Sequence, residues 1–271
     1  MRRSTALAFF SLGIAAYCLV PYLWFVLTSL KSPAELTSIP PTLVPSWQWG
    51  FYLSALEQHG VLAYIVNSAI VAGGATAISI VIGSLAAYAI ARFRLAWTNV
   101  YLMVLLAISM FPQLAIAGPV WRILNQLGWL NTYQGLIAAY IALSMPLAVW
   151  ILTTFFRDVS VEIEEAALID GCTRFQALYK VVIPLAAPGI LTAALLVFIH
   201  AWNEFFFALI IMTDPRVQTL PVGIALFPGE YTMPWGEIAA ASTLATLPLI
   251  VLTLVFQKGI VRGLSAGAVK G

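Results

Sequence analysis

The segment EEAALIDGCTRFQALYKVVIPL, residues 164–185, places three acidic and two basic side chains in a chain that is otherwise strongly apolar. The 271 residues are 62% hydrophobic and only 9% charged, with a mean hydropathy of +0.96. Soluble globular domains usually carry about 25% charged residues, so a single soluble core cannot hold this many apolar side chains. The composition therefore predicts a polytopic membrane protein, with the charged segment in a loop outside the lipid.

Six apolar segments are long enough to cross a membrane. A helix rises ~1.5 Å per residue and the hydrocarbon layer is ~30 Å thick, so about 20 apolar residues are needed for each crossing. None of the segments alternates as a strand would, and backbone groups in lipid must be paired internally. The sequence predicts an all-α fold in one transmembrane domain, residues 1–271, with spans at about 5–29, 62–91, 98–118, 135–156, 186–212 and 238–257.

The lysines and arginines are distributed unequally between the two sets of loops that six spans create. One set has only Lys31, Arg122 and Arg216. The other set has Arg2, Arg3, Arg92, Arg94, Arg157, Arg174, Lys180, Lys258, Arg262 and Lys270. By the positive-inside rule, both termini and the loop 157–184 are predicted to be cytoplasmic, in a multi-pass protein of the cytoplasmic membrane.

The loop 157–184 is predicted to begin with a short helix over about 161–170. Ser160 is suited to cap this helix, whose first turns carry glutamates near the positive end of the helix dipole. Gly171 is expected to end it, because glycine adopts the left-handed conformation after a helix at little cost. The chain is then expected to reverse direction.

A second short helix follows from Thr173 and Gln176, which form a T-x-x-Q capping box, and it is expected to end before Pro184. Two interpretations of the helix pair are open at this point. It could lie on the lipid surface, or it could present a face to another protein. Glutamate-rich helices are poor partners for anionic leaflets, which favours the protein partner.

The loop resembles the EAA motif of the membrane subunits of binding-protein-dependent ABC importers. The matching residues are Glu165, Ala166, Ala167, Gly171, Val181, Ile183 and Pro184, with Val181 and Ile183 where that pattern usually has Ile and Leu. Three more segments are similar to the maltose-type, carbohydrate-uptake branch of these permeases, namely HAWNEF at 200–205, QTLPVGIALF at 218–227 and GLSAGAVKG at 263–271.

The resemblance implies a type I ABC importer permease that works by alternating access. The implied partners are a second permease subunit, two copies of an ATP-binding subunit, an extracytoplasmic substrate-binding protein and a sugar. The chain itself is expected to be non-catalytic and to bind no cofactor, with ATP and Mg²⁺ held by the partner, since it carries no G-x-x-x-x-G-K-[ST] motif. A formal net charge of +2 gives no indication of a nucleic-acid partner.

By the same resemblance, the loop 157–184 is a coupling helix that docks on the ATP-hydrolysing subunit. The outward loop 213–237 is implied to meet the substrate-binding protein, and the cytoplasmic tail 258–271 to reach the ATP-binding subunits. The residues implied to carry the coupling are Glu165, Ala166, Ala167, Asp170, Gly171 and Pro184. The substrate is expected to be a neutral oligosaccharide or glycoside, with a glycerol phosphate or a polyol as the alternative.

Polar side chains at membrane depth are the candidates for the translocation path. A charge inside a membrane is unfavourable, so Glu204 is a functional candidate. The other candidates are Asn67, Gln113, Ser144, His200 and Asn203. Neutral donors and acceptors suit sugar hydroxyls. The alternative for Glu204 is a structural hydrogen bond, because it shares a helix face with His200.

Two other classes of protein are weighed against an ABC permease. An intramembrane enzyme needs a nucleophile with its base, or a metal cluster, at membrane depth, and no such pattern is visible. An ion-coupled secondary transporter would work without any ATPase and would often contain inverted repeats. A requirement for an ATPase subunit therefore distinguishes these hypotheses.

Overall fold

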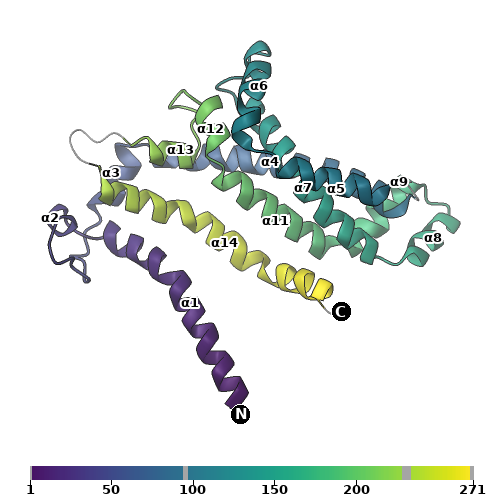
Figure 1. Cartoon of the computed structure of the whole chain (residues 1–271), viewed down its shortest axis with the longest axis horizontal. Helices are drawn as coiled ribbons and strands as arrows, with labels where there is room; N and C mark the ends of the chain where they lie inside the picture. The colour runs from purple at the N-terminus through teal and green to yellow at the C-terminus, as the bar shows by residue number, and fades with distance from the viewer. Residues whose placement is uncertain (1, 94–96, 228–232, 269–271) are drawn as a thin grey trace. The chain divides into compact units, whose positions relative to one another are not determined.

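The computed structural model describes residues 2–93, 97–227 and 233–268, with side chains described between residues 9 and 257 of these ranges. Every regular element in the described ranges is helical, as predicted (Figure 1). The elements are α1 (Arg2–Ser29), α2 (Pro33–Leu36), α3 (Gly50–Glu57), α4 (Val61–Arg92), α5 (Thr98–Ser109), α6 (Gln113–Gln126), α7 (Tyr133–Asp158), α8 (Val161–Ile169), α9 (Arg174–Ala177), the π-helical turn η1 (Leu178–Val182), α10 (Ile183–Leu185), α11 (Ala187–Asn203), α12 (Phe206–Ile211), α13 (Leu220–Ala225) and α14 (Trp235–Ala268).

Among the described residues, four helices are long and apolar enough to cross a membrane by themselves, namely Phe9–Ser29 within α1, all of α4 and α7, and Trp235–Gln257 within α14. Two bent pairs of helices raise the number to six if each pair forms one span. The first pair is α5 with α6, and the second is Arg174–Leu185 with α11. The six predicted spans agree with this upper number.

The predicted span over 98–118 is not one straight helix. α5 ends at Ser109, and α6 begins at Gln113 with its axis turned by 88°. Pro112 stands between them in an extended conformation, with φ −61° and ψ 122°. Proline has no N–H for the helix ladder and disfavours the helical conformation of the residue before it, so the break follows from the sequence.

The predicted helix over 186–212 is also interrupted. α11 ends at Asn203, Glu204 is extended with φ −67° and ψ 128°, and α12 begins at Phe206. The cause is a polar cap at Glu204, described below. The axis of α11 is also turned by 81° from that of the preceding helical stretch, Arg174–Leu185.

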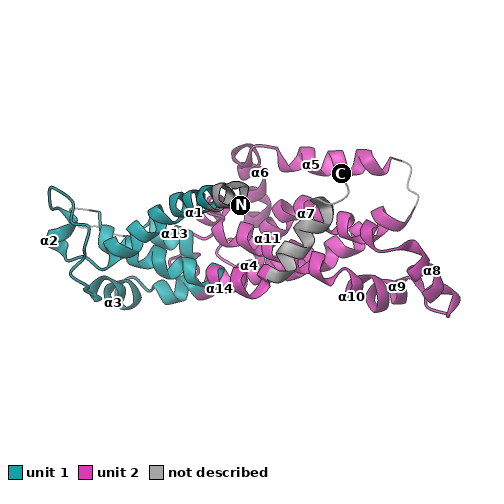
Figure 2. Ribbon diagram, turned by 90° about the horizontal axis from the view of Figure 1, so that it is seen from below, with its two compact units in different colours: residues 1–65, 220–249 teal, residues 66–219, 250–271 magenta. Residues whose placement is uncertain are grey.

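The chain divides into two compact units (Figure 2). Residues 1–65 and 220–249 form the first, in which Ser29 Oγ and the Tyr52 hydroxyl lie 2.8 Å apart and join α1 to α3. Residues 66–219 and 250–271 form the second, which contains the charged loop and every path candidate.

The core of the second unit includes α7 packed against α4 and α11. Leu152 and Phe156 of α7 and Val197 of α11 are fully buried there. Gly83 allows the close approach of α4 to α7, because a Cβ at this position would lie 3.3 Å from Leu152 Cδ1. Small residues that let helix backbones approach in this way are typical of membrane helix interfaces.

Candidate functional site

The charged loop is attached to the end of α4 by a buried carboxylate, Glu164 of α8, which is 2% exposed. Arg92 Nε donates to Glu164 Oε2 at 2.5 Å, and the Tyr88 hydroxyl donates to Oε1 at 2.5 Å. Arg92 Nη2 also donates to the Val159 carbonyl at 2.8 Å, at the end of α7. A buried carboxylate needs a cation and hydrogen bonds to replace its hydration, and both come here from α4.

Arg174, in the second helix of the loop, lies at the edge of this cluster. Its Nη1 is 3.9 Å from Glu164 Oε1, and its guanidinium lies 5.4 Å from the centre of the Phe93 ring. The Arg174 side chain is 55% exposed, so its ion pair with Glu164 is screened by solvent. The cluster therefore has a buried pair, Arg92 with Glu164, and a solvated rim.

The turn and the start of the second helix of the loop form as the sequence predicts. Gly171 has a φ of +90°, a conformation that side chains rarely adopt. The Thr173 N–H donates to Gln176 Oε1 at 2.9 Å, and the Gln176 N–H donates back to Thr173 Oγ1 at 3.2 Å, which completes the capping box.

Two details of the loop differ from the prediction. Ser160 stands at the N-cap position of α8, but its hydroxyl donates to the Glu162 carboxylate and accepts no backbone N–H of the helix. The second helix also does not end before Pro184. It continues as η1 and α10 to Leu185, because Pro184 occupies the first turn of α10, where a missing N–H is tolerated.

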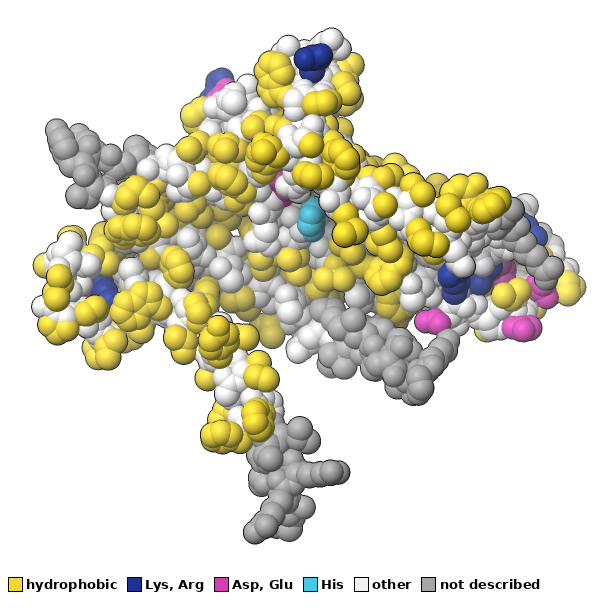
Figure 3. All heavy atoms as spheres, viewed as in Figure 1, with side chains coloured by type: hydrophobic (Ala, Val, Ile, Leu, Met, Phe, Trp, Pro, Cys, Tyr) yellow, Lys and Arg dark blue, Asp and Glu magenta, His cyan; other side chains and the backbone are white. Residues whose placement is uncertain are grey.

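The outer face of the helix pair is open to contact. Glu165, Ala166, Asp170, Gly171 and Pro184 are exposed and Ala167 is half-buried. Large apolar side chains stand beside them, with Ile169 86% and Phe175 64% exposed. Figure 3 shows charged side chains gathered at this end of the molecule, whereas hydrophobic ones cover most of the rest of the described surface in view.

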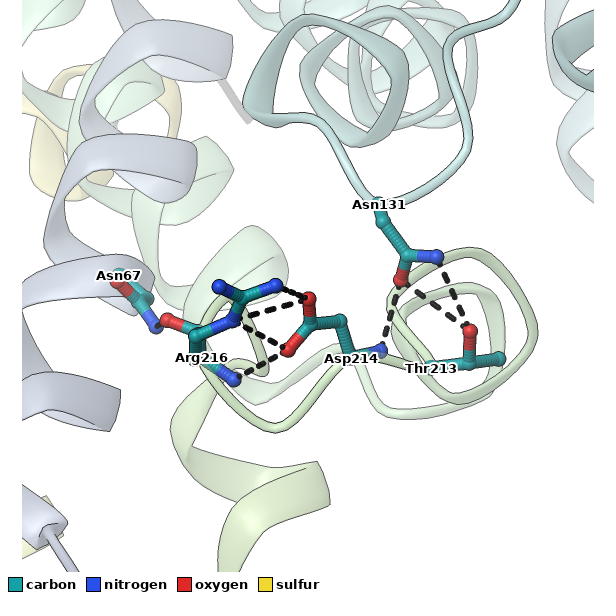
Figure 4. Close-up of polar contacts among 5 residues, drawn as sticks. All are labelled: Asn67, Asn131, Thr213, Asp214 and Arg216. Carbon is teal, nitrogen blue, oxygen red and sulfur yellow. Dashed lines mark hydrogen bonds and ion pairs between the residues drawn. The ribbon is translucent and has the colours of Figure 1, made fainter.

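The other end of α4 is joined to the outward loop through Asn67 (Figure 4). Its Nδ2 donates to the carbonyls of Arg216 at 3.1 Å and Gln218 at 2.9 Å, and its Oδ1 accepts from the Tyr133 hydroxyl at 2.7 Å. All the hydrogen-bonding groups of the amide except one lone pair are used in this way. Asn67 therefore links α4, α7 and the segment after α12.

The same outward loop is fixed by Asn131, a residue that sequence analysis did not single out (Figure 4). Its backbone N–H donates to Ile211 O at 3.0 Å, and its Oδ1 accepts from the Asp214 N–H at 2.8 Å. Its Nδ2 donates to Thr213 Oγ1 at 3.1 Å. Asn131 adopts φ +56°, which asparagine tolerates better than most residues. The sequence gives only a weak indication of this turn, because Asn131 is a polar residue that follows Gly128 and Trp129 closely.

Asp214 and Arg216 form an ion pair on the surface of this loop, at 2.6 Å between Oδ2 and Nη2. Hydrogen bonds from the Arg216 side chain and backbone lower the pKa of Asp214 to about 2. The Arg216 side chain is 87% exposed, so the outward loop presents a guanidinium to solvent. Residues 228–232 of the predicted loop 213–237 lie outside the described residues, and so do residues 269–271 and the side chains of the predicted tail 258–271.

Glu204 caps α12 rather than pairing with His200. Its Oε1 accepts from the Phe207 N–H at 2.9 Å and its Oε2 accepts from the Ala208 N–H at 3.1 Å. These donors are otherwise without partners at a helix start, and their positive dipole suits a carboxylate. The Tyr140 hydroxyl donates to the Glu204 carbonyl at 3.3 Å.

The remaining path candidates do not join one hydrogen-bonded cluster within the described residues. His200 is exposed, and Asn203, also exposed, donates from Nδ2 to the Ile199 carbonyl of its own helix at 2.8 Å. Gln113 is exposed at the start of α6. Ser144 is buried in α7, where its hydroxyl has no hydrogen-bond partner among the described residues. Their role in a path stays a prediction.

A family model described as "Binding-protein-dependent transport system inner membrane component" matches residues 79–266. The chain belongs to this family. The match covers the charged loop, α11, α12 and most of α14, and it confirms the resemblance found in the loop. The chain is therefore a multi-pass membrane subunit of a transport system, located in the inner membrane.

Full-length relatives support this assignment to the permeases. The trehalose/maltose transport system permease protein MalG of Thermococcus litoralis is 42% identical over 268 residues, which cover 95% of this chain and 94% of the relative. The sulfoquinovosyl glycerol transport system permease protein SmoH of Agrobacterium fabrum is 42% identical over 254 residues, covering 93% and 89%. The trehalose transport system permease protein SugB of Mycobacterium tuberculosis is 38% identical over 275 residues, covering 100% and 99%.

A solved structure has the same fold as this permease. It is a chain of a bacterial ABC transporter involved in the import of the acidic polysaccharide alginate, with a TM-score of 0.78 and 24% sequence identity, covering 95% of this chain and 96% of that one. This likeness confirms the predicted ABC importer permease fold.

Proposed function

We propose that this permease takes up a neutral oligosaccharide or glycoside, driven by ATP hydrolysis in a separate subunit. Two relatives, at 42% and 38% identity, are named as permeases for trehalose/maltose and for trehalose, which are neutral disaccharides. The polar side chains Gln113, His200 and Asn203 are exposed and carry hydrogen-bonding groups of the kind that sugar hydroxyls pair with.

The observation that carries this proposal is the helix pair formed by α8 and α9. Its outer face is exposed and combines small, apolar and acidic side chains, while its inner face is fixed to α4 by the buried pair of Glu164 and Arg92. A surface loop that only covered lipid would need no such anchor. A loop that receives force from a docked ATP-binding subunit needs one, because a mobile attachment would absorb the movement.

The proposal includes the full set of partners. A second permease completes the path, and the complex holds two ATP-binding subunits. One of them docks on the outer face of this chain at Glu165, Ala166, Ala167, Asp170 and Gly171, and a substrate-binding protein meets the outward loop. ATP and Mg²⁺ are bound by the ATP-binding subunits, and this chain contributes no catalytic group. Pro184 lies in the first turn of α10, the short helix that leads from the loop into α11.

The test is uptake of labelled maltose or trehalose into vesicles that hold the complete complex, with ATP hydrolysis measured in parallel. We expect Gly171→Pro and Glu165→Lys to abolish both uptake and the binding-protein-stimulated hydrolysis. Proline cannot adopt the φ of +90° found at Gly171, and a lysine reverses the charge of the docking face.

Glu162→Lys is the matched control for Glu165→Lys, because Glu162 is exposed on the same helix outside the motif. Its uptake should match that of the wild type when equal amounts of protein are in the membrane. Sugar uptake by wild-type vesicles without an ATP-binding subunit would contradict the proposal.

A further inference from the structure

We infer that α4 is the element that transmits movement between the cytoplasmic loop and the outward loop, with Glu164 and Asn67 as the positioning residues at its two ends. The inference rests on the proposed function and deepens it, because it assigns the connection between the two docking surfaces to named residues. Residues 66–92 of α4 and all the partners named below lie in the second compact unit.

The inner end of α4 is held by a charged attachment. Tyr88 and Arg92 lie one helical turn apart and bind the two oxygens of Glu164 separately, at 2.5 Å each. The side chains of Arg92 and Glu164 are 4% and 3% exposed. Arg92 also binds the Val159 carbonyl at 2.8 Å, so α4, the end of α7 and α8 meet at one guanidinium. A displacement of α8 would therefore have to break a buried ion pair or move α4.

The outer end of α4 is held by an uncharged side chain, the amide of Asn67, which uses nearly all of its hydrogen-bonding groups. Asn67 is 4% exposed and binds two carbonyls of the segment that follows α12. It also accepts from Tyr133 at the start of α7. That segment carries the exposed Arg216, and Asn131 fixes it on its other side. A movement of α4 along or about its axis would therefore move the surface that faces outward.

The helix between the two ends is suited to act as a rigid connection. Asn67 and Arg92 are 25 residues apart, about 38 Å at ~1.5 Å per residue, which exceeds the ~30 Å of the hydrocarbon layer. α4 contains no proline, whereas α1, α6, α7 and α14 each contain one inside the helix. Prolines are a common cause of helix kinks, so α4 lacks this cause of bending, and it runs as one continuous helix from Val61 to Arg92.

The experiment uses the complete complex in vesicles, with maltose or trehalose as the probe, and measures sugar uptake per ATP hydrolysed with binding protein present. We expect Glu164→Gln and Asn67→Leu each to lower this ratio about tenfold, within the range of typical coupling free energies. The double variant should lose no more than the worse single variant, because residues acting through one element are not additive. A purely structural role would lower the amount of complex without changing the ratio.

Two gentler variants keep the test decisive if a buried substitution prevents assembly. Tyr88→Phe and Tyr133→Phe each remove only the hydroxyl that reaches Glu164 or Asn67, and both should lower the ratio. Tyr101→Phe is their matched control, because Tyr101 is exposed on α5 without a side-chain hydrogen bond among the described residues, and Glu162→Gln is the control for Glu164→Gln. Both controls should stay within about twofold of the wild type, as is usual for surface changes.

An unchanged ratio at either end of α4 would overturn the inference, and so would losses that multiply in the double variant. Wild-type complex that shows no binding-protein-dependent sugar uptake would instead overturn the proposed function. The two failures are therefore separable in one set of vesicles.

Discussion

Two glutamates of the second unit are buried to a similar extent but are stabilised in different ways. Glu164 is 2% exposed and binds Arg92 and Tyr88, which lie 72 and 76 residues away in the sequence. Glu204 is 7% exposed and binds the backbone N–H groups of residues three and four positions ahead. One carboxylate joins distant segments, and the other shapes its own stretch of backbone.

The difference teaches what each carboxylate can transmit. A charge paired with a guanidinium on another helix holds two elements at a fixed distance, as coupling requires. A carboxylate that caps a helix start ends one helix and begins another, so it controls local geometry. Glu204 thus accounts for the break between α11 and α12 and does not require a partner side chain.

The largest expected effect follows from removing the charge at Glu164. Glu164→Gln leaves the Arg92 guanidinium, 4% exposed, without an anion, and removing one partner of a buried pair typically costs about 3–5 kcal/mol. Thermal unfolding of the purified chain in detergent should show this loss of stability.

A double variant provides the control for Glu164. Arg92→Leu combined with Glu164→Leu removes both charges, so no buried charge is left unpaired. The loss of stability in this double variant should be well below the sum of the losses in the two single variants. Additive losses would contradict the assignment of Arg92 and Glu164 as one buried pair.

A smaller effect is expected at Glu204, where the donors are neutral. In Glu204→Gln the amide oxygen can still accept from the Phe207 or Ala208 N–H, so we expect a loss of about 1 kcal/mol, the typical value of one neutral hydrogen bond. Glu204→Leu removes both acceptors and should lose about 1–2 kcal/mol. If Glu204→Gln destabilised the chain as much as Glu164→Gln does, the contrast between the two sites would be wrong.

The local features of the charged loop could be predicted because each depends on neighbouring residues. Thr173 and Gln176 specify their own capping box, and Gly171 specifies a turn that other residues rarely adopt. The resemblance in the loop could be found for the same reason, since the motif is contiguous. The six apolar segments were equally visible, because span length depends on composition alone.

The anchor of the loop could not be predicted, because nothing in the sequence links Arg92 to Glu164 across 72 residues. The motif also does not say which of the neighbouring glutamates points inward. The structure buries Glu164 and exposes Glu165. Of these two glutamates, the sequence had indicated a role in coupling only for Glu165. The break at Glu204 was hidden because residues 189–212 are mostly apolar and contain no proline, so the sequence there looks like one continuous helix.

The smallest expected effect concerns a carboxylate that is exposed, Asp214 of the outward loop. Its pKa is lowered from 3.8 to about 2 by hydrogen bonds from Arg216, so the folded state binds this proton less readily than the unfolded state. Its stabilising contribution is therefore fully present above the unfolded pKa of 3.8 and is lost as the pH falls towards about 2.

Asp214→Asn should lack this pH-dependent step, and its thermal unfolding in detergent should depend less steeply on acid pH than that of the wild type. The difference should be slight, because Arg216 is 87% exposed and solvent screens the pair. A carboxyl titration by nuclear magnetic resonance checks the site directly. A midpoint for Asp214 near 3.8 would mean that Arg216 does not pair with it in solution. A midpoint near 2 would show that an exposed carboxylate can pair with a guanidinium, as the buried Glu164 does. Its partner is nevertheless only two residues away, so the pair fixes local geometry, as Glu204 does.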